Sequence, residues 1–403
     1  MSPVPSWLQK AYNQDHITNV WRILSDREYS RICARSLSLA ASRCHPEPDP
    51  CRSPTAPLPT QPSSGAHPGE NHANHYSIAL GCSSENCYRN RYTDIQPYDR
   101  TRVAVSDHYF NGNWVREHAG GRWTIATQAP LPSTTYEFLG IIAGISPLIP
   151  PGELSSKFTR VRTVVQLTPY FESGRQKAHP YFPFEPGESR VIHPFEDSSE
   201  LPPLKLTLVK VEIIESANCA VCTVCIAPIS AEVQGPPTKP AVVFRHLLYG
   251  AWPDHGIPEP EDRASLLNFI RLVDHTNKDL SGLEATADVE PPIMVHCSAG
   301  VGRTGSFIAL CSLLRSNGLL SKPNPHTAER AVVHPPLPQS PLGPLPELIS
   351  WDEVSQEVDS LREQRPGMVQ RPEQVLLIYE TLIGAFMIHQ GQSPSQAPRH
   401  SYE

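Results

Sequence analysis

One short segment of the chain, HCSAGVGRTG, combines residue types that handle a phosphate ester. Cys297 and Arg303 are separated by five residues around a glycine-rich turn, which follows an apolar run and opens a helical pattern. A strand that leads through such a turn into a helix gathers backbone N–H groups and the positive end of the helix around an anion. These groups lower the pKa of a thiol, so Cys297 is a candidate nucleophile.

Arg303 suits the same anion, because a guanidinium binds two phosphoryl oxygens at once and a lysine does not. A nucleotide-binding loop of the GxxxxGK[ST] type is not predicted, since the segment lacks its lysine. The alternative for Cys297 is an ordinary buried thiol with a structural role.

The segment resembles the signature loop of the protein tyrosine phosphatases, in which HC is followed by five residues, Arg and Ser or Thr. Further motifs occur in that family's order from about residue 86 to residue 390. The resemblance implies an α/β (α+β) fold, with a twisted mixed β-sheet flanked by helices on both faces, and chemistry without cofactor or metal. It assigns catalytic roles to His296, Cys297, Arg303 and Thr304, and phosphate binding to Ser298, Ala299, Gly300, Val301, Gly302 and Arg303. Thr304 would hydrogen-bond the thiolate and improve it as a leaving group.

Two upstream segments resemble other loops of the family. AWPDHGIP resembles the mobile loop that carries the general acid, so Asp254 would protonate the leaving tyrosyl oxygen, with Trp252 and Gly256 as hinge and anchor. Such an acid contributes about 10²–10⁴-fold to a rate. NRYTDI resembles the phosphotyrosine-recognition loop, so Tyr92 would wall a deep pocket that excludes phosphoserine, and Asp94 would bind the substrate backbone. The alternative for AWPDHGIP is an ordinary surface turn, and the alternative for Tyr92 is a tyrosine of the core.

The second step of the implied reaction needs a positioned water. QRPGMVQRPEQ resembles the family segment whose glutamines place this water, which assigns the role to Gln370 and Gln374, with Asp254 now acting as the base. FESGRQKAHPYFP resembles the loop in which Glu172 would brace Arg303 and Lys177 would contact the acid loop.

The chain departs from the family pattern at positions outside these chemical groups. IATQAP has Ala129 where the family has Gly, YFNGN at 109–113 replaces YINAS, and Phe182 replaces a Trp. These departures affect packing and surface specificity. The CxxCxxC run of Cys219, Cys222 and Cys225 lacks a fourth metal ligand, so we expect a buried strand or hairpin there.

The elements that must position these residues follow from hydrophobic spacing. Ser25 with Glu28, and Ser350 with Glu353, have the spacing of capping boxes that would each start a helix. Strands are predicted from the runs at 103–110, 123–128, 162–168, 205–214, 220–229, 241–249 and 291–297, and helices within 5–35, after 350 and from near Pro372.

Sixteen of the 44 prolines lie in two short segments that break this pattern. We expect disordered Pro-rich inserts at 42–77 and 322–346, because such segments cannot bury enough apolar surface to offset their ordering entropy. Their PxxP matches could bind SH3-type domains, although such matches also arise by chance. The expected organisation is N-terminal helices at 1–41 that belong to or pack on the catalytic domain, the domain itself at 78–392, and a disordered tail at 393–403.

Composition excludes several other classes of protein. A net charge of −7 gives no overall field for nucleic acid or an anionic membrane, and no apolar run is long enough for a membrane span. The ten cysteines are too sparse for a disulfide scaffold, which indicates a reducing compartment and a cytoplasmic protein with access to the nucleus.

The implied activity is hydrolysis of phosphotyrosine in proteins, kinases among them, through a phosphocysteine on Cys297. One rival is a dual-specificity or lipid phosphatase, against which NRYTDI argues. The other is a catalytically silent phosphotyrosine-binding scaffold, which would usually have lost Cys297, Asp254 or Arg303.

Overall fold

The structure is a computed structural model. It describes residues 4–44, 73–105, 108–153, 158, 160–194, 201–229, 240–253, 256–259, 262–281, 288–320 and 339–389, and within the first range the side chains of 4–40.

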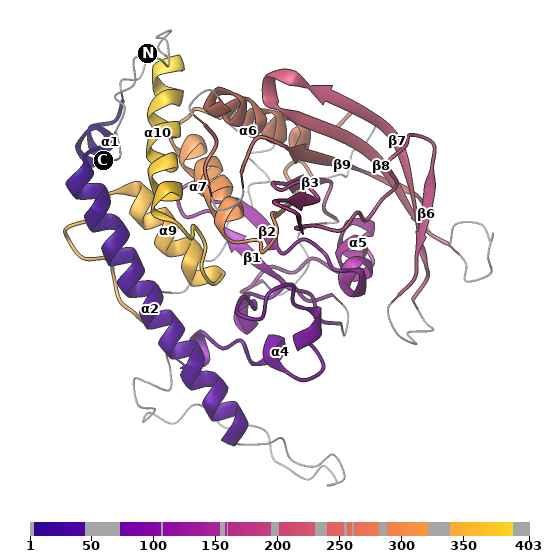
Figure 1. The fold of residues 1–403 in the computed structure, drawn as a ribbon, viewed down its shortest axis with the longest axis horizontal. Coiled ribbons are helices and arrows are strands. Elements are labelled where there is room, and N and C mark those ends of the chain that lie inside the picture. Colours follow the sequence, from indigo (N-terminus) through magenta and orange to yellow (C-terminus); the bar gives the residue numbers. More distant parts are fainter. Residues whose placement is uncertain are drawn as a thin grey trace.

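A mixed eight-stranded sheet forms the centre of the described chain (Figure 1). The four central strands are parallel and the outer pairs antiparallel, so the predicted mixed sheet is confirmed. In spatial order the strands are β1 (Gly112–Arg116), β2 (Trp123–Thr127), β10 (Ile293–His296), β3 (Thr163–Gln166), β9 (Val242–Tyr249), β8 (Cys219–Pro228), β7 (Leu204–Ile214) and β6 (Ser189–Ile192). A separate hairpin pairs β4 (Phe171–Glu172) with β5 (Arg175–Gln176).

Helices cover both faces of this sheet, as the resemblance implied (Figure 1). One face packs against α6 (Arg263–Lys278), α7 (Gly302–Ser316), α9 (Glu353–Gln364) and α10 (Pro372–His389), and the other against α5 (Thr135–Ala143). The N-terminal α1 (Ser6–Ala11) and α2 (Gln14–Cys44) join the first of these cores, and α2 contacts α9 and α10. The short helices are α4 (Ala79–Cys82), η1 (Cys87–Arg89), η2 (Asp99–Thr101), η3 (Pro132–Thr134) and η4 (Glu215–Ala217).

The central position of β10 determines where the chemistry lies. β10 pairs with β2 on one side and β3 on the other, and these three strands are almost wholly buried, as is typical of parallel strands with helices on both faces. In open sheets of this kind, sites form beyond the carboxyl ends of the strands. β10 ends at His296, so Cys297 is the first residue beyond this edge.

Three local predictions were wrong. Ser25 does not start a helix: it lies inside α2, where its hydroxyl donates to Trp21 O at 2.7 Å. Packing against α9 and α10 lets one helix run through both halves of this segment. In place of Ser350, Asp352 caps α9 by accepting a hydrogen bond from Val354 N at 2.9 Å.

The third error concerns the first predicted strand. The described residues of its range, 103–105 and 108–110, form an isolated bridge between Val105 and His108 and no strand. Val103, Val105 and Phe110 pack into the core from this irregular segment. The strand lies instead at β1, whose Gly112 and Asn113 concealed it, because pairing with β2 overrides their low strand propensity.

The ends of both Pro-rich segments are packed. Tyr76 is fully buried, and its hydroxyl donates to Glu363 at 2.8 Å, while Ser340 donates to the same carboxylate at 2.9 Å and Arg31 of α2 at 2.6 Å. Residues 73–77 and 339–346 therefore belong to the packed body, since this buried carboxylate needs their donors. The start of the first insert was also predicted wrongly, because α2 continues through 42–44. Residues 45–72 and 322–338, with the PxxP matches at 54–57 and 59–62, lie outside the described residues, as does the tail.

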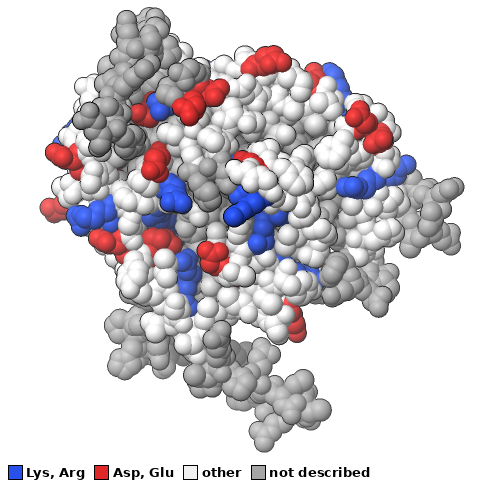
Figure 2. Space-filling view, viewed as in Figure 1, with Lys and Arg blue, Asp and Glu red and all other residues white. Residues whose placement is uncertain are grey.

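Basic and acidic side chains are interspersed over the face that carries α2 (Figure 2). This agrees with the small net charge and leaves any anion site to be built by local groups. Within the described ranges, none of the helices has both the length and the hydrophobicity required to cross a bilayer.

Candidate active site

The turn between β10 and α7 is held in a shape that only glycine permits. Gly300 has φ +73°, and a Cβ there would overlap the carbonyl group of Thr127 at the end of β2. The amide of Gly300 donates to Cys297 Sγ at 3.3 Å. The thiol is 4% exposed at the floor of this turn, directly before the N-terminus of α7.

The surroundings of Cys297 favour the thiolate. Burial raises the pKa of this thiol, but Arg303, the Thr304 hydroxyl and the backbone N–H groups of Val301 and Thr304 outweigh burial, so its pKa lies below the ordinary value. Thr304 Oγ1 is buried with no hydrogen-bond partner among the described residues, so it is free to interact with the sulfur, whose pKa it helps to lower. A lowered thiol pKa at this position agrees with the predicted role of Cys297 as nucleophile, which stays a prediction.

Arg303 is fixed beside the thiol by a carboxylate from the separate hairpin. Glu172 accepts from both terminal nitrogens of Arg303, at 2.6 and 3.1 Å, and Trp252 O accepts a third bond at 3.0 Å. The side chains of Arg303 and Glu172 are 5% and 9% exposed, so water screens this pair only weakly. The contact predicted between Glu172 and Arg303 is present.

The segment predicted to carry the general acid starts beside Arg303, because Arg303 donates to the backbone oxygen of Trp252. Trp252 is buried, and its Nε1 donates to Gly256 O at 3.2 Å. This bond connects the two residues that the resemblance names as hinge and anchor. Asp254 itself lies outside the described residues, so its position as general acid stays a prediction.

Tyr92 stands against the phosphate-loop side of the site. Its hydroxyl lies 2.8 Å from Ser298 Oγ, and Ser298 donates its own hydroxyl proton to Lys177 O at 2.8 Å. Tyr92 is therefore the donor to Ser298. Lys177 joins the site through this backbone carbonyl, and its side chain is buried. Asp94 is exposed at the rim.

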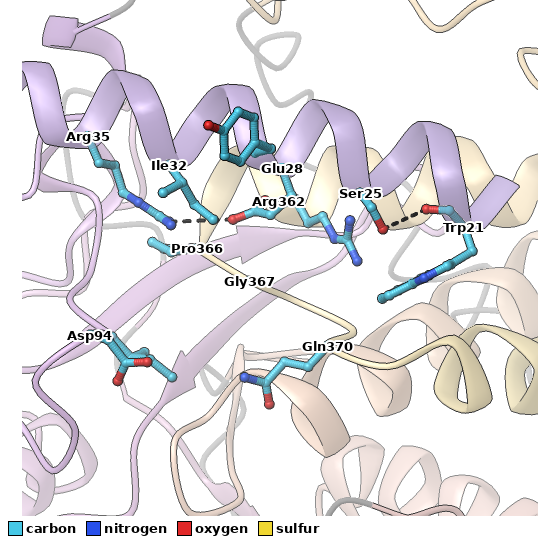
Figure 3. A pocket seen from close by; sticks show the side chains of 12 residues that line it. Trp21, Ser25, Glu28, Ile32, Arg35, Asp94, Arg362, Pro366, Gly367 and Gln370 are labelled. Carbon is cyan, nitrogen blue, oxygen red and sulfur yellow. Dashed lines mark hydrogen bonds and ion pairs between the residues drawn. The ribbon is translucent and has the colours of Figure 1, made fainter.

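The two predicted glutamines meet the first turn of α7. A Cβ on Gly302 would lie 2.8 Å from Gln370 Oε1 and 2.9 Å from Gln374 Nε2, so both amides lie against this glycine. Gln370 N donates to Gln374 Oε1 at 2.9 Å. Gln370 and Asp94 also line one groove with residues of α2 (Figure 3).

His296 supports the loop from below. Burial lowers the pKa of its ring to about 4, so the ring is neutral near pH 7. Its Nδ1 lies 3.1 Å from Cys297 O and its Nε2 3.2 Å from Tyr181 Oη. A fully buried neutral ring in these contacts positions the backbone of Cys297.

Sequence reasoning missed Arg365, which orients the loop from the opposite side. Its fully buried guanidinium donates to Gly300 O at 2.8 Å and Ala299 O at 3.0 Å, and to the side chains of Asn111 and Asn113. These bonds fix the orientation of the peptide groups at Ala299 and Gly300. Arg365 lies in the segment that carries the glutamines, and the alternating asparagines of YFNGN were the available signal.

Ala129, which stands where the family has glycine, connects to neighbouring segments through its backbone. Ala129 N donates to Ser298 O at 2.9 Å, and Arg91, directly before Tyr92, donates to Ala129 O at 3.1 Å. Phe182, the second departure, is buried against Tyr181. These substitutions leave the loop connected to its neighbours.

The three cysteines of β8 do not converge. Alternation along the strand places Cys222 in one hydrophobic core and Cys219 in the other. Within the described part of the chain, no group of three or more potential ligands could hold a metal ion.

The chain matches known proteins in the same region. The family model described as protein-tyrosine phosphatase matches residues 86–323, which carry the loop, its arginine and the strands that position them. The chain belongs to this family.

Curated members share moderate identity with this phosphatase-family chain. It is 30% identical over 334 residues to human receptor-type tyrosine-protein phosphatase H, covering 79% of this chain and 23% of that protein. It is 29% identical over 328 residues to mouse tyrosine-protein phosphatase non-receptor type 4, covering 77% and 26%. A match to human phosphatidylinositol phosphatase PTPRQ is 30% identical over 229 residues, covering 55% and 8%. The chain thus spans about a quarter or less of these relatives.

A solved structure that concerns the fingerprint of PTPN18 on distinct HER2 tyrosine phosphorylation sites has a similar fold. The TM-score is 0.52 at 25% identity, over 77% of this chain and 88% of that one.

Proposed function

We propose that this chain is a protein-tyrosine phosphatase that works through a phosphocysteine on Cys297, with residues 78–392 as its catalytic domain and 1–41 packed on it. The observation that carries the proposal is the buried Cys297 thiol of lowered pKa, at the N-terminus of α7 and beside Arg303. A thiolate, a ring of amides and a braced guanidinium form a nucleophile and a dianion site in one place.

In the first step the thiolate attacks phosphorus, the S–P bond forms, and the bond to the tyrosyl oxygen breaks. Arg303 and the loop amides stabilise the charge on the transferring phosphoryl group. Asp254 gives the leaving phenoxide its proton, which matters because a phenol has a pKa of about 10. Tyr92, held through Ser298, walls the ring of the substrate.

In the second step water attacks the phosphocysteine. Gln370 and Gln374, lying against Gly302, orient this water, and Asp254 accepts its proton. The P–S bond breaks and the thiolate leaves, stabilised by the Thr304 hydroxyl. Inorganic phosphate then departs.

The test uses the full chain with phosphotyrosine peptides. Vanadate-sensitive release of phosphate is expected, with a rapid-quench phosphoenzyme whose added mass maps to Cys297. Cys297→Ser should abolish both, and Asp254→Ala should retain substrate while losing turnover. Wild-type protein that forms no phosphocysteine and releases no phosphate would refute the proposal in favour of a silent phosphotyrosine-binding scaffold.

A second candidate substrate class is a phosphoinositide, because one relative is named a phosphatidylinositol phosphatase. The wall formed by Tyr92 and the small net charge favour phosphotyrosine. Parallel assays with phosphotyrosine peptide, phosphothreonine peptide and phosphoinositide vesicles decide between them. Faster turnover of either alternative substrate would replace the tyrosine-specific assignment.

The expected setting is a reducing compartment, with the cytoplasm as the proposed location and tyrosine-phosphorylated proteins as partners. The cysteines whose side chains the structure describes are free thiols, which supports this setting. Fractionation of cells that express the tagged full chain tests the location.

A further inference from the structure

The residue before Gln370 has a strained backbone. Val369 is buried and has φ +58°, a left-handed conformation that β-branched residues rarely adopt. Such strain costs on the order of 1–3 kcal/mol and persists only where the surroundings hold it. The direction of Gln370 therefore depends on whatever holds this turn.

Arg362 of α9 holds the turn from one side. Its Nε donates to Met368 O at 2.8 Å and one terminal nitrogen to Val369 O at 2.7 Å, while the other terminal nitrogen donates to Leu24 O of α2, also at 2.7 Å. The guanidinium is 2% exposed and lies 5.6 Å from the ring centre of Trp21. Three bonds from one buried cation tie the turn to α2.

Figure 3 shows Arg362 reaching between α2 and the segment that leads to Gln370. Gly367 and Gln370 line the same groove as Trp21 and Ser25 of α2. The N-terminal helix is therefore the outer wall of the space in which the turn is held.

The phosphate loop holds the turn from the other side. Val369 N donates to Val301 O at 3.2 Å, and Gly305 of α7 allows this approach because a Cβ there would stand 2.6 Å from Val369 N. The turn is clamped between the helix that follows Cys297 and an arginine anchored on α2. A loss on either side would release the strain and turn Gln370 away.

We propose that Arg362, anchored on Leu24 of α2, is a positioning residue for the second step, and that it makes the phosphocysteine select water over alcohols. This inference rests on the proposed function. In that step an oxygen–phosphorus bond forms, the P–S bond breaks, the thiolate leaves and the attacking oxygen gives its proton to Asp254. An alcohol could attack phosphorus in the same way and give up its proton to Asp254. A preference for water over alcohols therefore requires that Gln370 holds a water molecule in place.

The experiment measures phosphoryl transfer to glycerol relative to phosphate release, with a phosphotyrosine peptide and the full chain. Arg362→Lys keeps the charge, but one ammonium nitrogen replaces the three separate nitrogens that contact Met368 O, Leu24 O and Val369 O. The ratio of glycerol phosphate to phosphate should rise about tenfold, the equivalent of losing about 1.4 kcal/mol of water selection. Formation of the phosphocysteine, followed by rapid quench, should change less than about twofold.

Arg27→Lys is the matched control. Arg27 also joins α2 to α9, through Asp359 at 2.9 and 3.0 Å, and it donates to Gly343 O, but none of its recorded bonds reaches the turn at 366–370. Its transfer ratio should equal that of the wild type. An equal rise in both variants, or no rise in a folded Arg362→Lys protein, would overturn the proposal.

Two further variants cover misfolding and the route of action. Gly305→Ala displaces the turn from the α7 side, so it should raise the ratio even if Arg362→Lys does not fold; a folded Gly305→Ala protein with an unchanged ratio counts against the proposal. In a Gln370→Ala background, Arg362→Lys should add nothing further, and additive effects would contradict action through Gln370. A wild-type chain without phosphocysteine would instead refute the proposed function itself.

Discussion

Replacing Gly300 with Ala tests whether the shape of the phosphate loop produces the activity. The left-handed backbone at φ +73° costs an alanine about 1–2 kcal/mol. Its Cβ would also overlap the Thr127 carbonyl and stand 2.9 Å from Gln128 N, so the loop must move by about 1 Å or the fold must absorb about 1–3 kcal/mol of overpacking. A displacement of that size at a reacting centre costs about 10²-fold in rate.

Gly318→Ala separates the two contributions. Gly318 follows α7 with φ +71°, but an added Cβ there meets no atom within 4 Å. It should lose about 1–2 kcal/mol of unfolding free energy in urea and keep wild-type kcat/KM on a phosphotyrosine peptide. Gly300→Ala should lose about 10²-fold or more in kcat/KM. If Gly300→Ala stays within about twofold of the wild type, or if Gly318→Ala loses as much activity, the reasoning from the clash is wrong.

Three further outcomes are expected. Alkylation of Cys297 by iodoacetamide should reach half its maximal rate at a pH below the ordinary thiol pKa of 9.0, and Thr304→Val should move that midpoint upward, because it removes a hydrogen bond to the thiolate. Burial raises the pKa of Glu357 from 4.5 to about 7, so the folded state binds the proton more tightly than the unfolded state. The free energy of unfolding should therefore fall by about 3 kcal/mol as the pH rises from about 4.5 to 7. In urea titrations, the Glu357→Gln protein should not show this pH dependence. Tyr92→Phe loses the bond to Ser298, worth about 1 kcal/mol, and should lower kcat/KM about fivefold in steady-state assays.

The placement of Cys297 and Arg303 on one turn could be predicted because their spacing along the chain is short. Cys297 and Arg303 share one turn, so a strand followed by a glycine-rich loop already implies that both face one anion. Six of the seven predicted strands were also readable. The four parallel strands β2, β10, β3 and β9 appear as short apolar runs because helices cover both of their faces. The antiparallel β7 and β8 appear as longer runs rich in β-branched residues. The contact of Glu172 with Arg303 needed the family resemblance, since the hairpin lies far away in sequence.

The residues that hold the site in place could not be predicted from the sequence. The alternating asparagines of YFNGN could have indicated a buried donor such as Arg365, but no sequence pattern marks which backbone carbonyls Arg365 and Arg362 will reach. Ser25 and Glu28 have the spacing of a capping box, but no helix starts there, because α2 packs against α9 and α10 along its length and runs through both residues. The packed end of the first Pro-rich segment was hidden because Tyr76 gains its partner only when α9 presents Glu363.

The buried carboxylate of Glu363 has a consequence for how this chain can change in length. It binds Tyr76 and Ser340, which lie in the C-terminal parts of the two Pro-rich segments, and Arg31 of α2 completes the cluster. Doubling the length of a chain segment whose ends are held in place costs only about 0.6 kcal/mol. These two positions are therefore where the chain can acquire or lose residues, or carry an inserted reporter domain, without disturbing the strained turn or the phosphate loop.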